Sequence, residues 1–181
     1  EVALDPELLG KVFENLLASY NPETATTARK ATGSYYTPRE IVDYMVTESL
    51  KYYFKTKFEN TFPPEELDEK LTSLFSYSHE EQPFNEKETD FIIEKINELK
   101  IIDPAVGSGA FPIGVLNKLV FLLSKLDPHN EKWKAQQFRA LDYITDPTLK
   151  NELREKIENN FKRNELDYGR KLYLIQNCIY G

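Results

Sequence analysis

The chain has 181 residues, 40% of them hydrophobic and 13% aromatic, which is enough for a packed domain and excludes a disordered chain. Its formal net charge of −7 argues against a simple basic nucleic-acid-binding module. Cys178 is the only cysteine, so an intrachain disulfide is excluded and a reducing cytoplasm is the expected location.

Three further classes of feature are not expected. No apolar run reaches the roughly 18 residues of a membrane span, and the first residues do not resemble a secretory signal. His79 and His129 stand alone in polar stretches, so we expect no metal site and an exposed position for both. Because the chain starts at Glu1 without a methionine and stops abruptly at Gly181, we expect it to be a piece of a longer protein.

Residues 1–56 predict two helices. Asp5-Pro6-Glu7 is a helix start, apolar residues follow at helical spacing to Tyr20, and Asn21-Pro22 ends the helix. After a polar loop, Thr37-Pro38-Arg39-Glu40 fits a capping box with Pro38 at the first helical position. The residues expected on the buried faces are Leu8, Leu9, Val12, Phe13, Leu16 and Leu17 in the first helix and Ile41, Val42, Met45, Val46 and Leu50 in the second, which Tyr52, Tyr53 and Phe54 continue.

Residues 57–98 are interpreted as a helical insertion. Pro63-Pro64-Glu65-Glu66 starts one helix and Asn85-Glu86-Lys87-Glu88 starts another. The residues expected to point inward are Leu67, Leu71, Leu74 and Phe75 in the first of these helices and Phe91, Ile92, Ile96 and Leu99 in the second.

Residues 99–181 begin with the most informative stretch, Ile101 to Phe111. A short apolar run ends in Asp103 and a proline, and a Gly-x-Gly turn leads into a long helix opened by Pro112. In an open α/β sheet a small charged ligand binds at this place, because glycines let the backbone approach it and the helix start offers free N–H groups. The apolar face expected on that helix, which Asp127-Pro128 ends, consists of Ile113, Leu116, Leu119, Val120, Leu123 and Leu126.

The remainder predicts more helices and a second strand. Residues 130–160 suggest one or two charged helices with a break near Asp146-Pro147. Residues 167–176 are expected to be helical, and a strand is expected to begin in residues 177–180. A basic cluster of Lys162, Arg163, Arg170 and Lys171 either contacts DNA phosphates or forms a solvated helix face, the latter being the stronger interpretation.

Two motifs carry a family resemblance. The pattern Asp-Pro-Ala-x-Gly-Ser-Gly-x-Phe at 103–111 resembles motif I of S-adenosylmethionine-dependent DNA methyltransferases, and residues 33–42 resemble their motif X. Motif X before motif I is the order of the N6-adenine methyltransferases of restriction–modification systems. Residues 8–20 and 168–181 also look like that family, in particular like large enzymes that fuse methylation to restriction or act in phage exclusion.

The resemblance implies a fold that is mainly α with a partial α/β element. Residues 1–56 would be the N-terminal helices with motif X. Residues 57–98 would be the insertion, and residues 99–181 the truncated start of a Rossmann-like domain that binds S-adenosylmethionine. Asp103 would accept hydrogen bonds from the cofactor's ammonium group, and the helix after Thr37 would face it and bind the carboxylate. The implied cofactor-binding residues are Tyr36 (or Tyr35), Thr37, Asp103, Pro104, Ala105, Gly107, Gly109 and Phe111.

The resemblance also implies what this chain lacks. The family holds the target amine with an Asn/Asp-Pro-Pro-aromatic loop, and the only Pro-Pro here, at 63–64, does not match it. We therefore expect the catalytic residues, a ribose-binding acid and the DNA-recognition domain beyond Gly181, and no activity from the chain alone. The full-length protein would bind DNA, flip out adenine and methylate it. The incomplete sheet would favour self-association of this piece.

Each motif also has a simpler explanation. Thr37 could serve only as a helix cap, and Asp103 only as an acid that binds N–H groups of its loop. Gly107 and Gly109 could serve only a tight turn, and Phe111 is expected to pack in the core in either case. Two other functions stay open: a methyltransferase acting on protein or a small molecule, and a non-enzymatic helical interaction module.

Overall fold

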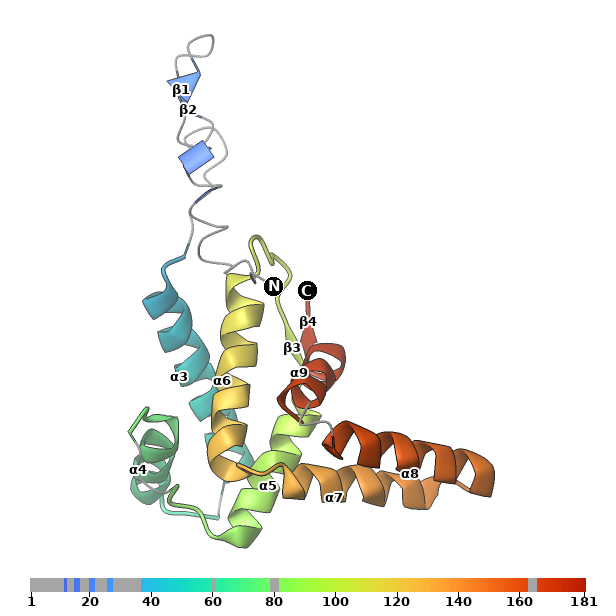
Figure 1. Ribbon diagram of the computed structural model, residues 1–181. Helices are drawn as coiled ribbons and strands as arrows, with labels where there is room; N and C mark the ends of the chain where they lie inside the picture. The colour runs from blue at the N-terminus through green and yellow to red at the C-terminus, as the bar shows by residue number, and fades with distance from the viewer. Residues whose placement is uncertain are drawn as a thin grey trace.

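The computed structural model describes residues 12, 15–16, 20–21, 26–27, 37–59, 61–78, 82–162 and 166–181, and this part is mainly helical, as predicted (Figure 1). Its strands have two residues each. The elements are β1 (Tyr20–Asn21), β2 (Thr26–Thr27), α3 (Arg39–Lys57), α4 (Pro64–Phe75), α5 (Glu86–Glu98), β3 (Ile101–Ile102), α6 (Ala110–Leu126), α7 (Glu131–Ala140), the 3₁₀ turn η1 (Leu141–Tyr143), α8 (Pro147–Lys162), α9 (Leu166–Asn177) and β4 (Ile179–Tyr180).

The first predicted helix is described only in part. Val12, Asn15 and Leu16 are helical, but the side chains of Val12 and Leu16 are exposed rather than buried as predicted. Tyr20 does not continue the helix, because Tyr20 and Asn21 pair with Thr27 and Thr26 in an antiparallel ladder. The rest of the predicted helix lies outside the described residues, as do His79, Tyr35 and Tyr36.

The second predicted helix begins one residue later than its capping box requires. Pro38 is the N-cap of α3: its ψ of 148° is extended, and its carbonyl accepts the N–H of Val42 at 3.1 Å. The N-cap is therefore Pro38 and no side chain among the described residues caps this helix, so the prediction of Thr37 as the cap is wrong. At α5 the capping box does form, because the Asn85 side chain accepts the Glu88 N–H at 3.1 Å and Glu88 accepts the Asn85 N–H at 2.9 Å.

The buried faces are narrower than the sequence predicted. In α3 the buried residues follow every fourth position, whereas Ile41 and Met45 are about half exposed and Tyr52 is 72% exposed. Ile41 precedes the buried Val42 by one residue, which turns it about 100° away around the helix. In α6 Ile113 is exposed for the same reason, since it lies about 120° around the helix from Leu119. The buried residues are Val42, Val46, Leu50 and Phe54 in α3 and Val115, Leu116, Lys118, Leu119, Leu122, Leu123 and Leu126 in α6.

One hydrophobic core joins α3, α4, α5, α6 and α9. The residues predicted to point inward from α4 are all buried, and in α5 Ile92, Ile96 and Leu99 are buried while Phe91 is partly buried. Side chains from residues 37–56, 57–98 and 99–181 therefore share this core, and the division into three parts stays a prediction. No helix in the described ranges is long and apolar enough to cross a membrane.

The two strands of the predicted cofactor domain pair in parallel. Ile101 lies opposite Ile179 and Ile102 opposite Tyr180, and the Asp103 N–H donates to the Tyr180 carbonyl at 2.8 Å. Helices α6 to α9 form the crossover that parallel pairing requires. The predicted second strand is confirmed, and the Rossmann-like sheet stays a prediction.

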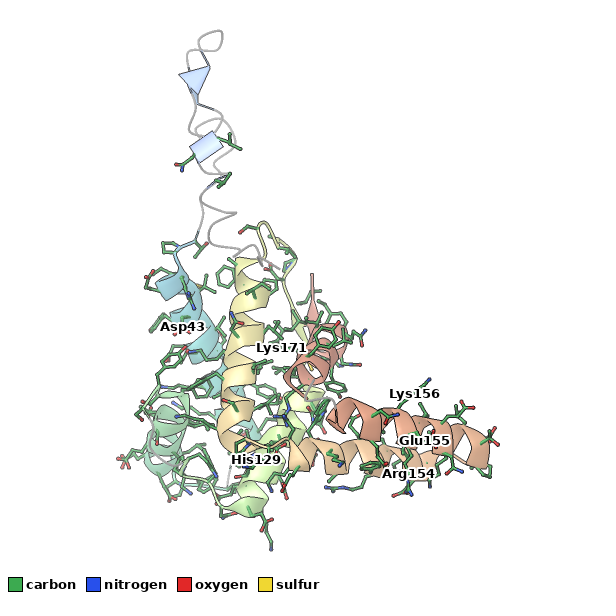
Figure 2. The ribbon with its side chains drawn as sticks, in the orientation of Figure 1. Asp43, His129, Arg154, Glu155, Lys156 and Lys171 are labelled. Atoms are coloured by element: carbon green, nitrogen blue, oxygen red, sulfur yellow. The ribbon has the colours of Figure 1, made fainter. Side chains whose placement is uncertain are left out.

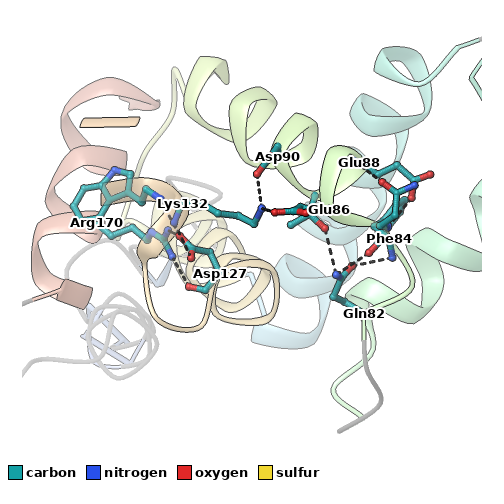
Figure 3. Close-up of polar contacts among 11 residues, drawn as sticks. Gln82, Phe84, Glu86, Glu88, Asp90, Asp127, Lys132 and Arg170 are labelled. Carbon is teal, nitrogen blue, oxygen red and sulfur yellow. Dashed lines mark hydrogen bonds and ion pairs between the residues drawn. The ribbon is translucent and has the colours of Figure 1, made fainter. Parts of the chain in front are cut away.

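One member of the basic cluster, Arg170, does not lie on the solvated face that the sequence suggested. Arg170 of α9 is buried, and its guanidinium binds the buried Asp127 carboxylate at 2.6 Å (Figure 3). The same carboxylate accepts the backbone N–H groups of Lys132 and Trp133, so it also caps α7. Of the other members, Lys171 is exposed (Figure 2), while the side chains of Lys162 and Arg163 lie outside the described residues. His129 is exposed, as expected.

The contact between α3 and α6 depends on Gly114. A Cβ atom at this position would lie 2.5 Å from Cγ1 of Val42, much closer than a van der Waals contact. We expect Gly114→Leu to lower the free energy of unfolding by about 1–3 kcal/mol through overpacking. The measurement is urea unfolding, with Asn117→Leu on the exposed face of the same helix as the control. Equal stability of the two variants would contradict this packing.

Three buried or partly buried groups near α9 favour the fold at neutral pH. Burial raises the pKa values of the Cys178 thiol and of the Tyr53 and Tyr173 phenols above their usual values of 9.0 and 10.0. A raised pKa stabilises the folded state while the group is protonated, so this contribution is complete below the unfolded-state pKa and is lost as the pH rises. We expect the urea midpoint to fall above about pH 9. In Tyr173→Phe the urea midpoint should fall less steeply above about pH 10, because this variant has no phenol to ionise at that position. A urea midpoint that does not change with pH in the unmodified chain would contradict this contribution.

Candidate cofactor-binding site

The candidate site is built on the loop between β3 and α6. In Figure 1 this loop lies at the end of the molecule where β3 and β4 end and where α3 and α6 begin. The two helices run in the same direction and meet where Gly114 of α6 lies against Val42 of α3. The carboxyl ends of two parallel strands and the N-terminal ends of two helices therefore share one end of the fold, the position at which α/β folds bind ligands.

The two carboxylate oxygens of Asp103 differ in their surroundings. Its Oδ1 accepts the backbone N–H of Ala105 at 3.0 Å, which holds the turn after β3. Its Oδ2 is buried and has no hydrogen-bond partner in the part of the chain that the structure describes. Burial of a hydrogen-bond acceptor without a donor costs free energy in a folded protein. Such an acceptor is therefore a candidate partner for a donor on a bound ligand.

Two glycines bend the loop. Gly107 has φ of +56° and Gly109 has φ of +85°, a region that other residues rarely adopt. The Gly109 N–H donates to the Val106 carbonyl at 2.8 Å and closes the turn. A Cβ atom at Gly109 would meet nothing within 4 Å, so this glycine serves the backbone conformation and leaves space on its open side.

Helix α6 starts directly at this turn. Gly109 is its N-cap, and the helix begins at Ala110, two residues before Pro112, which was predicted to open it. The first N–H groups of a helix have no partner within it, so those of Ala110 and Phe111 are directed to the loop end of the fold. Phe111 packs against the core, as expected.

The structure brings most of the predicted site residues to one loop. Asp103 is half-buried, Pro104, Ala105 and Gly107 are exposed, and Gly109 and Phe111 are half-buried. Thr37 is half-buried and immediately precedes the Pro38 cap of α3, at the same end of the fold. Tyr36 lies outside the described residues. That all of these residues bind S-adenosylmethionine stays a prediction.

Two residues were missed in the sequence, Gly181 beside this loop and Lys118 in the middle of α6. Gly181 lies against the loop, because a Cβ atom there would come within 2.3 Å of Val106 Cγ2 and 3.2 Å of the Asp103 carbonyl. Lys118 is buried on α6 against Asp43 of α3. The sequence feature that could have identified Lys118 is the presence of a lysine at a core-facing position of an otherwise apolar helix.

Fold and site together define a mainly helical domain with a strand–glycine loop–helix element beside a pair of parallel strands. Along 129 residues the chain is 27% identical to a protein of Methanocaldococcus jannaschii named "Putative type II restriction enzyme and methyltransferase RM.MjaORFECS2P". The match covers 70% of this chain and 11% of the relative, so the matched part is about a tenth of that protein's length. No protein-family model matches the chain, and no solved structure matches it.

Proposed function

We propose that this chain is part of a DNA methyltransferase of a restriction–modification system, and that it holds the amino-acid end of S-adenosylmethionine. The observation that carries the proposal is the Oδ2 of Asp103 beside the glycine turn, which is buried and has no hydrogen-bond partner among the described residues. Similarity to the Methanocaldococcus jannaschii protein supports the enzyme class. The specific reaction proposed, transfer of a methyl group to adenine N6, rests on the order of motifs X and I.

The residues at this end of the fold suit the cofactor's charged groups. A carboxylate oxygen at Asp103 can accept from an ammonium group while the other oxygen keeps the loop folded. The starts of α3 and α6 supply free N–H groups and positive dipole ends, which suit a carboxylate. When bound, S-adenosylmethionine would supply an electrophilic methyl group.

This chain's own residues would bind and orient the cofactor. None of its sequence matches the Asn/Asp-Pro-Pro-aromatic loop that holds the target amine, so we propose that the isolated chain transfers no methyl group. Positioning of the two reactants accounts for much of the rate of such a transfer. DNA would be bound by the full-length protein.

Calorimetric titration of the 181-residue chain tests the cofactor site. S-adenosylmethionine is expected to bind with one-to-one stoichiometry, and ATP at the same concentration is expected to give no heat. Equal binding of both ligands, or none of either, would contradict a cofactor site and favour a structural role for the glycine loop.

The proposed base specificity has a separate test. The full-length protein, incubated with DNA and radiolabelled cofactor, is expected to give N6-methyladenine on hydrolysis of the DNA. Label recovered only in protein or in a small molecule would favour the rival class of methyltransferase.

A further inference from the structure

Lys118 is the buried charge that the proposed cofactor site leaves unexplained. It lies in α6 and is only 3% exposed, and its ammonium group lies 4.6 Å from the centre of the Tyr77 ring. Its ammonium group contacts Asp43 Oδ1 of α3 at 2.7 Å and the Tyr77 hydroxyl at 2.8 Å. The Tyr77 hydroxyl in turn donates to Asp43 Oδ1 at 3.1 Å, so the three groups close a triangle, the Lys118 cluster. Figure 2 labels Asp43 on α3 at this place.

Stability alone gives little reason for a lysine here. An ammonium group loses its hydration on burial, and an apolar residue of the same shape is often as stable as a buried ion pair or more so. Methionine has a similar length and would suit the leucine-lined face of α6. An ion pair between a buried ammonium group and a half-exposed carboxylate is instead well suited to fixing one alignment among several.

The contact between α3 and α6 needs such an alignment. Near their starts the two helices meet through Gly114, Val42 and Val46, which are small or short apolar residues. Apolar surfaces of this kind have no directional preference and fit more than one register. The ion pair is directional, and it joins the fifth residue of α3, near the start of that helix, to the ninth residue of α6, in the middle of that helix.

We propose that the Lys118 cluster positions the start of α3 relative to the Asp103 loop. This inference rests on the proposed function, because the two helix starts are the parts that would hold the cofactor's carboxylate and ammonium groups. Lys118, Asp43 and Tyr77 are positioning residues in this account. They act through the helices that carry the site.

The test replaces Lys118 with methionine and measures two quantities. Asp43 remains solvated in this variant, because its side chain is 46% exposed. The dissociation constant for S-adenosylmethionine is expected to rise about tenfold. The distance between spin labels at Tyr44→Cys and Ser124→Cys, on the exposed faces of α3 and α6, is expected to shift or broaden.

Lys70→Met is the matched control. Lys70 also pairs with two carboxylates, Glu66 and Glu88, but it joins α4 to α5 and touches neither α3 nor α6 in these pairs. Both quantities are expected to stay unchanged in this variant at a temperature where all the proteins are folded. A purely structural role for Lys118 would lower the melting temperature and leave the affinity of the folded protein unaltered.

The outcomes separate this inference from the proposed function. If the unmodified chain binds no S-adenosylmethionine, the proposed function fails and the spin-label distance alone decides on the positioning role. Unchanged affinity and unchanged distance in Lys118→Met overturn the inference. If Lys118→Met does not fold, Tyr77→Phe, which removes only the hydroxyl, takes its place. The dissociation constant and the spin-label distance must then change in the same direction by a smaller amount. No change in either quantity overturns the inference.

Discussion

Replacing Asp103 with alanine is expected to lower the affinity for S-adenosylmethionine by roughly ten- to a hundredfold, the range for losing hydrogen bonds to a charged group. The physical reason is the free Oδ2, which would accept from the ammonium group. Asp103→Asn should give a smaller loss, because an amide oxygen can still accept the Ala105 N–H that holds the turn. Calorimetry on the three proteins measures the difference.

Asp146 provides the control for Asp103. Its Oδ1 accepts the N–H groups of Thr148 and Leu149 at the start of α8, so it has the same turn-holding role in a different part of the chain. Asp146→Ala should leave cofactor affinity unchanged. If Asp103→Ala binds as tightly as the unmodified chain, Asp103 serves only its loop.

Removal of the Arg170 side chain is expected to have the largest effect on stability. Arg170 and Asp127 are both buried, with side chains 5% and 4% exposed, and their ion pair joins α9 to the junction of α6 and α7. Breaking such a pair leaves a buried charge and costs about 3–5 kcal/mol. Arg170→Ala should therefore shift the urea midpoint far below that of the unmodified chain.

The neighbouring Lys171 separates this effect from general loss of positive charge. Its side chain is exposed on the same helix, so Lys171→Ala should change the free energy of unfolding by less than about 0.5 kcal/mol. Equal stability of the two variants would show that the Arg170 ion pair contributes nothing to the fold.

Local signals predicted most of the helices. These signals act within one or two turns of chain. The structure has a helix end at each of four of them, namely Pro63-Pro64, the Asn85 capping box, Asp127-Pro128 and Asp146-Pro147. A second strand beginning in residues 177–180 was also predicted, and the structure has β4 at Ile179–Tyr180. At α3 the prediction was wrong by one residue, because the extended ψ of Pro38 keeps it outside the helix.

Long-range contacts could not be predicted in this way. Periodicity marks an apolar arc, but the helices packed against that arc decide which of its members are buried; Val42 is buried in α3 and Ile41 is exposed. Charged residues pose the same difficulty. The sequence predicted Arg170 as a surface residue, because its partner Asp127 lies 43 positions earlier and only the fold brings the two together.

The shape of the glycine loop was easier to predict than the packing around it. The Gly-x-Gly sequence after a strand predicted a sharp turn, and both glycines have positive φ. Two explanations of Asp103 were open, a loop-holding acid and a ligand acceptor. The structure assigns Oδ1 to the first role and leaves Oδ2 available for the second.

The most direct test of the account compares S-adenosylmethionine with an analogue that lacks the α-amino group, in the unmodified chain and in Asp103→Ala. The account predicts that loss of the amino group weakens binding to the unmodified chain and has little further effect on the variant, since the ammonium group and Oδ2 are partners. An equal loss of affinity in both proteins would contradict it.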